Sequence, residues 1–204
     1  MSRNVPSCSC LGAQEVFVRR EDISVVLSHL RPSRGVCEHL SRLPFFDAKS
    51  SDVPRRIVSF TAVHLRWLEG SCLSRASRSG DTAEADNVCH MRIAFVNKWR
   101  LSIGLEFSPL VVVADGESSN DLQELMDHGA MHLHGLQSSI VAVGIDFWLL
   151  VYATETLGSF VSTFSLNACS VRQSWNFSSC TFHVSSDAKN LQRAQHLNES
   201  FELI

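Results

Sequence analysis

The feature that most constrains the fold is a short apolar run in the middle of the chain, Leu110 to Ala114 in "PLVVVADG". Its three consecutive valines are β-branched and favour a strand. A half-exposed strand would alternate apolar and polar residues, whereas this run is continuous until it ends at Asp115 and Gly116. The run therefore predicts a strand that is covered on both faces of a sheet.

Two alternating segments precede this run and predict a hairpin. Apolar residues occupy every second position from Met91 to Phe95 and again from Trp99 to Phe107. Such alternation is typical of a strand with one buried face. Asn97 and Lys98 lie between the two segments as a turn, so the segments are predicted to pair as antiparallel strands.

Other parts of the chain predict shorter elements. Apolar residues at helical spacing predict a helix over 22–30 and a further turn or two over 37–43. Residues 55–68 are predicted to hold a strand, the Ser- and Thr-rich part up to about 184 further short strands, and 187–198 a final helix.

Length and composition indicate one folded domain. A chain of 204 residues with a hydrophobic fraction of 45% can bury a core of its own. The predicted fold is a single α+β domain over residues 16–204, with a mixed, largely antiparallel sheet and a few packed helices. Residues 1–15 are predicted to be disordered, and the Ser- and Gly-rich residues 69–90 to form a long loop.

The most hydrophobic stretch of the chain covers residues 139–157. A membrane span is one interpretation, since about 20 apolar residues cross a bilayer. Asp146 lies near the middle of the stretch, however, at a cost of about 2.5 to 3.5 kcal/mol on insertion into lipid. Two buried strands that break near Gly144 to Asp146 are the preferred interpretation, and the membrane anchor is kept as an alternative.

Charge and residue usage weigh against several classes of protein. The formal net charge is −3 and the basic residues are interspersed with acidic ones, so no basic surface for nucleic acid is predicted. Only three of the 18 basic residues are lysines, and arginine, serine and cysteine are frequent. This composition is typical of a recently arisen or spurious reading frame, because arginine and serine each have six codons.

The seven cysteines are too scattered to indicate a disulfide framework. The first residues lack the apolar core of a secretory signal, so reduced thiols and an intracellular, cytoplasmic location are predicted, with a mitochondrial or membrane location as the alternative. Two Asn-x-Ser patterns, at Asn176 and Asn198, match the glycosylation acceptor but have no consequence in a cytoplasmic protein.

The histidine-rich stretch "DHGAMHLHGL" raises the question of a metal site. A helix from about Ser119 to Leu136 is predicted, since its apolar residues gather on one face. Glu124, His128 and His132 then follow one stripe at the margin of that face and are candidate ligands for zinc. A solvated helix face is the preferred interpretation, because the His-Glu-x-x-His order of zinc hydrolases is absent.

Asp115 is a second candidate for chemistry. An acidic residue at the carboxyl end of a buried strand lies where open α/β sheets bind ligands. Asp-Gly is also a common turn sequence, and a turn is the preferred interpretation here.

The remaining motifs are incomplete. Cys8, Cys10, Cys37 and His39 are potential zinc ligands whose spacing is too short for a structural site. Ser186 and Lys189 match Ser-x-x-Lys without its companion motifs. Phosphate-loop, dinucleotide and serine-hydrolase patterns are absent from the sequence.

Three hypotheses on function follow. The leading one is a non-enzymatic, lineage-restricted or spurious product, since no catalytic set of residues is complete. The second is a metal-dependent hydrolase that uses Asp115 with the Glu124, His128 and His132 cluster. The third is a membrane-associated protein anchored through residues 139–157.

Overall fold

The computed structural model describes residues 20–47, 54–65, 91–114, 120–133, 140–159, 162–178 and 180–183. In chain order the elements are α1 (Arg20–His29), α2 (Arg34–Leu40), β1 (Thr61–Leu65), α5 (Ile93–Ser102), β2 (Leu110–Ala114), α6 (Asn120–Asp127), β3 (Met131–His132), α7 (Ile140–Tyr152), β4 (Glu155–Ser159), α8 (Thr163–Ser174) and β5 (Thr181–His183). The segments predicted to be disordered (1–15), a long loop (69–90) and a final helix (187–198) lie outside the described residues.

The described strands form one parallel sheet in the order β3-β2-β1-β4-β5. β1 pairs with β2 on one side, with Thr61 opposite Leu110, and with β4 on the other, with Thr61 opposite Glu155. Both pairs are parallel, as are β2 with β3 and β4 with β5. The predicted mixed, largely antiparallel α+β sheet is therefore wrong, and the fold is an open α/β sheet.

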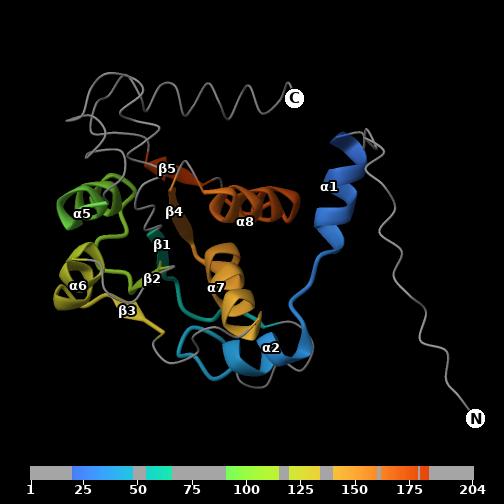
Figure 1. Ribbon diagram of the computed structural model, residues 1–204, viewed down its shortest axis with the longest axis horizontal. Helices are drawn as coiled ribbons and strands as arrows, with labels where there is room; N and C mark the ends of the chain where they lie inside the picture. The colour runs from blue at the N-terminus through green and yellow to red at the C-terminus, as the bar shows by residue number, and fades with distance from the viewer. Residues whose placement is uncertain are drawn as a thin grey trace, which may run out of the picture.

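Helices cover both faces of the sheet (Figure 1). α5 and α6 lie on one face, and α2, α7 and α8 on the other. α7 follows the edge strand β3 in the chain and packs against β1 and β2. It is followed by β4, which lies on the other side of β1. The sheet therefore extends in both directions from β1, first through β2 to β3 and then through β4 to β5.

β2 confirms the prediction of a strand covered on both faces. Leu110 and Val112 pack in the cluster under α5 and α6, whereas Val111 and Val113 pack in the cluster under α7 and α8. All four side chains are at most 4% exposed. The continuous apolar run exists because neither face of this strand meets water.

The predicted hairpin at 91–107 is wrong, because most of this segment is helix α5. Ile93, Val96 and Trp99 are buried at helical spacing, whereas Leu101 is 65% exposed. The helix ends at Ser102, and Gly104, two residues later, takes the left-handed conformation at φ 68°. The alternation of apolar residues arises from exposed side chains as well as buried ones.

The predicted pair of strands in 139–157 is also wrong. Residues Ile140–Tyr152 form helix α7, and only Glu155–Ser159 is a strand. α7 packs against β1, β2 and α8 and buries most of its second half. Among the helices in the described part of the chain, none has the length and apolar character that crossing a bilayer requires.

Several other elements match the sequence-based predictions, and two differ. α1 and α2 confirm the helical periods at 22–30 and 37–43, and β1 and β5 confirm strands in 55–68 and near 181. The helix predicted over 119–136 ends at Asp127, where Gly129 adopts φ 86°. α8 occupies a segment predicted as short strands.

Candidate functional site

The winding of the chain reverses at the carboxyl edge of the sheet, between β1 and β4, and this switch point is the position at which open α/β sheets form a ligand-binding crevice. The chain proceeds from β1 to β2 on one side and later to β4 on the other, and the described helices that follow β1 and β4, α5 and α8, lie on opposite faces of the sheet. In open α/β sheets, ligands bind where the winding reverses in this way. The fold therefore places its candidate site next to the ends of β1 and β4.

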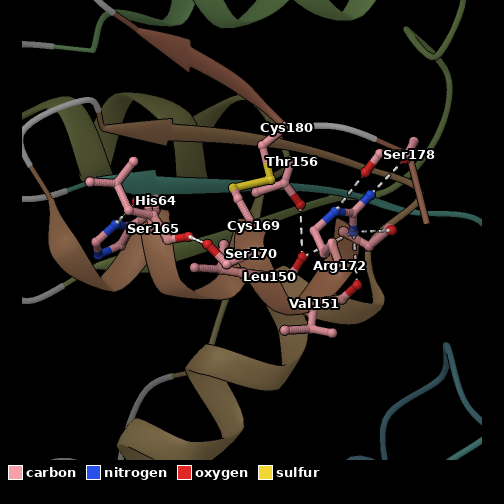
Figure 2. Close-up of a disulfide and its surroundings, with 12 residues drawn as sticks. His64, Leu150, Val151, Thr156, Ser165, Cys169, Ser170, Arg172, Ser178 and Cys180 are labelled. Atoms are coloured by element: carbon pink, nitrogen blue, oxygen red, sulfur yellow. Dashed lines mark hydrogen bonds between the residues drawn. A yellow bond between two sulfur atoms is a disulfide. The ribbon is translucent and has the colours of Figure 1, made fainter. Parts of the chain in front are cut away.

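His64 lies one residue before the end of β1 and is buried, with 3% exposure. A hydrogen bond of 2.6 Å joins its Nδ1 to the hydroxyl of Ser165, in the first turn of α8 (Figure 2). The ring of Phe164 lies against the imidazole, with 5.2 Å between ring centres. β1 and the start of α8 are thereby locked together at the crevice.

The amino terminus of α8 faces this crevice because α8 follows directly on β4. Ser162 caps the helix, and its side chain accepts a hydrogen bond from the Ser165 amide. The first amides of a helix have no partners within the helix, and they carry the positive end of its dipole. This combination makes a helix start an anion site where the ligand can reach it, and Thr163 in the first turn is exposed.

Gly158 in β4 allows α8 to approach the sheet. A Cβ atom at this position would lie 2.9 Å from the Cβ of Ser165 and 2.9 Å from the Phe182 ring. Such distances are too short for any side chain to fit without a shift. Glycine in β4 is therefore required for the close contact that seats α8, as in other α/β proteins in which a glycine permits helix and strand to pack closely.

His64 and Ser165 have the spacing of a base and a nucleophile, but they cannot act as one. The Ser165 side chain is wholly buried between β4 and α8, with 0% exposure, so no substrate can reach its oxygen. The pair instead positions the start of α8 against β1. The site as described is suited to binding an anionic group rather than to covalent catalysis.

The predicted metal residues do not share one helix face. Glu124 lies on α6, His128 follows the end of that helix, and His132 belongs to β3. His128 Nδ1 lies 2.7 Å from the Glu124 carbonyl oxygen, and His132 Nδ1 lies 3.0 Å from the carbonyl oxygen of Val112. No cluster of three or more His, Cys, Asp or Glu side chains able to hold a metal occurs in the described ranges.

Other predicted positions are placed as follows. Asp115, Ser186, Lys189, Cys8 and Cys10 lie outside the described residues. Cys37 is buried in α2, and its thiol donates a 3.6 Å hydrogen bond to the Pro32 carbonyl. His39 Nδ1 lies 2.9 Å from the Gly35 carbonyl within the same helix.

Arg172 is a feature that the sequence did not reveal. It lies in the last turn of α8 with 0% exposure. Its guanidinium donates to four carbonyl oxygens around the end of α7: Leu150 (3.1 Å), Val151 (2.8 Å), Ala153 (2.7 Å) and Thr154 (3.1 Å). Burial lowers the pKa of Arg172 to about 10, and the charge of Glu155 opposes that shift. Arg172 thus caps α7 at the amino edge of the sheet, away from the crevice.

A disulfide joins Cys169 of α8 to Cys180, just before β5 (Figure 2). The expectation that the cysteines are reduced is therefore wrong for this pair. The two cysteines are eleven positions apart in the sequence, a spacing that matches no metal-binding or redox motif. The pairing follows from the packing of α8 on β4 and β5, which local sequence does not show.

Asp146 lies on α7 and is partly buried. Burial raises the pKa of its carboxyl group to about 7. The sequence drew attention to this residue only as an obstacle to membrane insertion. In the fold, burial is the cause of the raised pKa of this carboxyl group.

The strand order, the helices on both faces and the crevice define a doubly wound, Rossmann-like α/β protein. Neither a protein-family model nor a curated protein matches the sequence. Solved structures do match the fold. The crystal structure of POFUT1 in complex with GDP-fucose (crystal form I) aligns with a TM-score of 0.51 at 18% identity, over 81% of this chain and 50% of that one. The apo form of POFUT1 (crystal form I) aligns with a TM-score of 0.52 at 17% identity, over the same shares. The chain thus spans about half the length of these structures, and the likeness is one of fold.

Proposed function

We propose that this chain binds the diphosphate of a nucleotide sugar at the carboxyl edge of its sheet, and that it supplies the nucleotide-binding half of a glycosyltransferase-like protein. The observation that carries the proposal is the meeting of the β1–β4 crevice with the start of α8, held by the 2.6 Å bond between His64 and Ser165. A diphosphate matches the positive end of a helix in charge and in its need for amide donors.

The comparison supports the fold on which this proposal is built. POFUT1 is a fucosyltransferase, and one of the aligned structures holds GDP-fucose. The resemblance is an analogy at the level of fold, which hosts many functions, so the argument rests on the site and not on the resemblance. Because this chain covers half of that structure, the proposal is limited to binding of the donor nucleotide.

Calorimetric titration of the full chain with GDP tests the proposal. We expect saturable binding, and we expect Thr163→Glu to weaken it at least about tenfold, since two like charges at the helix start repel. The same substitution favours the helix by about 0.3 to 1 kcal/mol, because a negative charge suits a helix amino terminus. Loss of binding without loss of stability would therefore report on the ligand site alone.

Gln173→Glu is the matched control. It adds the same charge to an exposed position at the other end of α8. We expect GDP affinity to remain within about twofold of the unchanged chain, since the charge lies at the far end of the helix. Absence of a binding isotherm at millimolar GDP, or equal weakening by both variants, would contradict the proposal.

A further inference from the structure

The end of α8 presents an asparagine at an exposed, sharply turned position. Asn176 adopts the left-handed conformation, at φ 56°. Its amide donates to the Gln173 carbonyl at 3.0 Å, and the Phe177 amide donates to the Arg172 carbonyl at 2.9 Å. These two bonds form the Schellman motif that ends a helix, with Asn176 at the position where glycine or asparagine is preferred.

Asn176 also begins the tripeptide Asn176-Phe177-Ser178, which matches the acceptor pattern for N-linked glycosylation. All three residues are exposed, and Asn176 lies in the turn that ends α8. Among the described residues, this exposure leaves the Asn176 side chain accessible to a glycan. An acceptor of this kind is expected in a surface loop of a protein that enters the secretory pathway.

The disulfide gives an independent indication of the same environment. Cys169 and Cys180 lie on either side of the tripeptide and are bonded. Disulfides form and persist in oxidising compartments, such as the lumen of the endoplasmic reticulum, and are rare in the cytosol. A covalent bridge and an exposed acceptor in the same turn thus both favour a lumenal environment over the cytoplasmic one expected from the sequence.

We propose that Asn176 is an N-glycosylation site. A membrane oligosaccharyltransferase would form the bond between Asn176 Nδ2 and the anomeric carbon of an oligosaccharide carried on a polyprenyl diphosphate. The bond between that carbon and the diphosphate oxygen breaks, the diphosphate leaves with the electron pair, and the amide nitrogen gives up one proton.

The hydrogen bonds of the folded turn indicate whether the glycan is transferred before or after the turn folds. The Ser178 hydroxyl, which the acceptor pattern requires, donates to the Thr154 carbonyl at 2.6 Å and accepts from Arg172 Nη2 at 2.6 Å. Since the bond to the Thr154 carbonyl forms only when the end of α8 docks beside the end of α7, the hydroxyl is free for the transferase only before this docking, and transfer takes place at that stage.

The position of the glycan leaves the proposed nucleotide site open. α8 begins beside the crevice at the carboxyl edge and ends at Ser174, beside the amino edge. Twelve helical residues span roughly 18 Å along the axis. Glycosylation of Asn176 is therefore independent of the proposed nucleotide binding, and the failure of one proposal would not contradict the other.

The test is expression of the full chain behind a cleavable secretory leader in a eukaryotic cell, with Asn198→Gln throughout to remove the second acceptor pattern. We expect one glycan-sized decrease in gel mobility that peptide-N-glycosidase reverses. Mass spectrometry should then find aspartate in place of asparagine at position 176, and the peptides of Cys169 and Cys180 linked under non-reducing conditions.

Two variants distinguish the role of Asn176 as a glycan acceptor from its role in ending helix α8. Asn176→Gly keeps a residue suited to the left-handed conformation and should abolish the mobility change. Ser178→Thr keeps the acceptor pattern and the hydroxyl, and should retain the change. A chain secreted with unmodified Asn176, or a mobility change that persists in Asn176→Gly, would overturn the proposal.

Discussion

Arg172 shows how a fully buried charge is accommodated in this fold. Its donors satisfy carbonyl oxygens at the end of α7, including Val151 and Ala153, which would otherwise face an apolar core. Replacing it by methionine keeps much of the volume and removes every donor. We expect Arg172→Met to lower the free energy of unfolding by about 3 to 5 kcal/mol, measured by urea denaturation, because several buried carbonyls lose their partners together.

Arg34→Met provides the comparison. The Arg34 guanidinium bonds Glu38 at 2.9 Å on the surface of α2, and its side chain is 92% exposed. Exposed ion pairs of this kind contribute about 0 to 1 kcal/mol, so this variant should unfold almost as the unchanged chain does. Similar losses for the two variants would mean that Arg172 does not act as a cap for α7.

Asp146 makes stability depend on pH. Burial raises the pKa of its carboxyl to about 7 in the folded chain, whereas in the unfolded chain it titrates near 4. The folded state therefore binds more protons between these values, so this group's contribution falls as pH rises from about 4 to about 7. We expect Asp146→Asn to be more stable than the unchanged chain by on the order of 2 kcal/mol at pH 8, and to differ little from it at pH 4.

Thermal unfolding measured from pH 4 to pH 8 checks this expectation. Asp127→Asn is a suitable control because Asp127 is an exposed carboxyl at the end of α6. A difference between Asp146→Asn and the unchanged chain that stays constant with pH would show that the pKa of Asp146 is the same in the folded and unfolded chains, and would contradict the expectation.

The two residues at the centre of the candidate site show why that site could not be predicted from the sequence. His64 stands alone in the apolar run "FTAVHL", and this is the one local signal that could have drawn attention to it. Its partner Ser165 lies 101 positions further along the chain, in a stretch rich in serine. No local pattern distinguishes this serine from its neighbours, because its role depends on α8 crossing Gly158.

At the scale of elements, three helices end in the same way. α5, α6 and α8 each stop where a residue takes the left-handed conformation: Gly104 (φ 68°), Gly129 (φ 86°) and Asn176 (φ 56°). In each case the next amide donates to a carbonyl in the last turn, as in Leu105 to Arg100 at 2.9 Å and Ala130 to Leu125 at 3.0 Å. The chain therefore fixes its helix lengths with a few residues that tolerate positive φ.

Two glycines give a test with effects of opposite sign. An added Cβ meets nothing within 4 Å at Gly104 or at Gly35, so space is not what distinguishes them. Gly104→Ala should cost about 1 to 2 kcal/mol, because alanine is strained at positive φ. Gly35→Ala should stabilise by about 0.5 to 1 kcal/mol, because Gly35 lies within α2. Chemical denaturation measures both, and a shift in the same direction for the two variants would contradict this explanation of the helix end.

The errors at this scale have a common cause. In α5 the residues at every second position include both Trp99, which is buried, and Leu101, which is not, so a period of two was inferred from a helix. In α7 nearly every residue is apolar, so the run has no period at all. Helix and strand cannot be distinguished in such runs without knowing what surrounds them, which is set by packing.

At the scale of the whole molecule, the sheet was predicted wrongly because of one element. The antiparallel expectation came from the hairpin assigned to 91–107, where the structure has α5. The strand at Leu110–Ala114 was predicted correctly, and burial on both faces is what a parallel sheet between two helical layers requires. The crevice depends on β1 pairing with β4, with Val63 opposite Leu157, and such a distant pairing leaves no trace in local periodicity.

The Cys169–Cys180 disulfide is the one covalent link between distant positions in the described part of the chain, and it ties the edge strand β5 to the helix that covers β4. A closed loop of this length restricts the unfolded chain by about 3 kcal/mol in the chain-entropy estimate. We expect a reductant to lower the free energy of unfolding by about that amount, measured by urea denaturation of the full chain with and without dithiothreitol. A Cys169→Ala, Cys180→Ala double variant should match the reduced chain in stability and should not respond to reductant.

Because β5 is held to β4 by a short pairing, the reduced chain should also lose hydrogen-exchange protection first in β5. If the double variant still responded to reductant as the unchanged chain does, another pair of cysteines would carry the effect, and the stabilising role assigned to this bridge would be wrong.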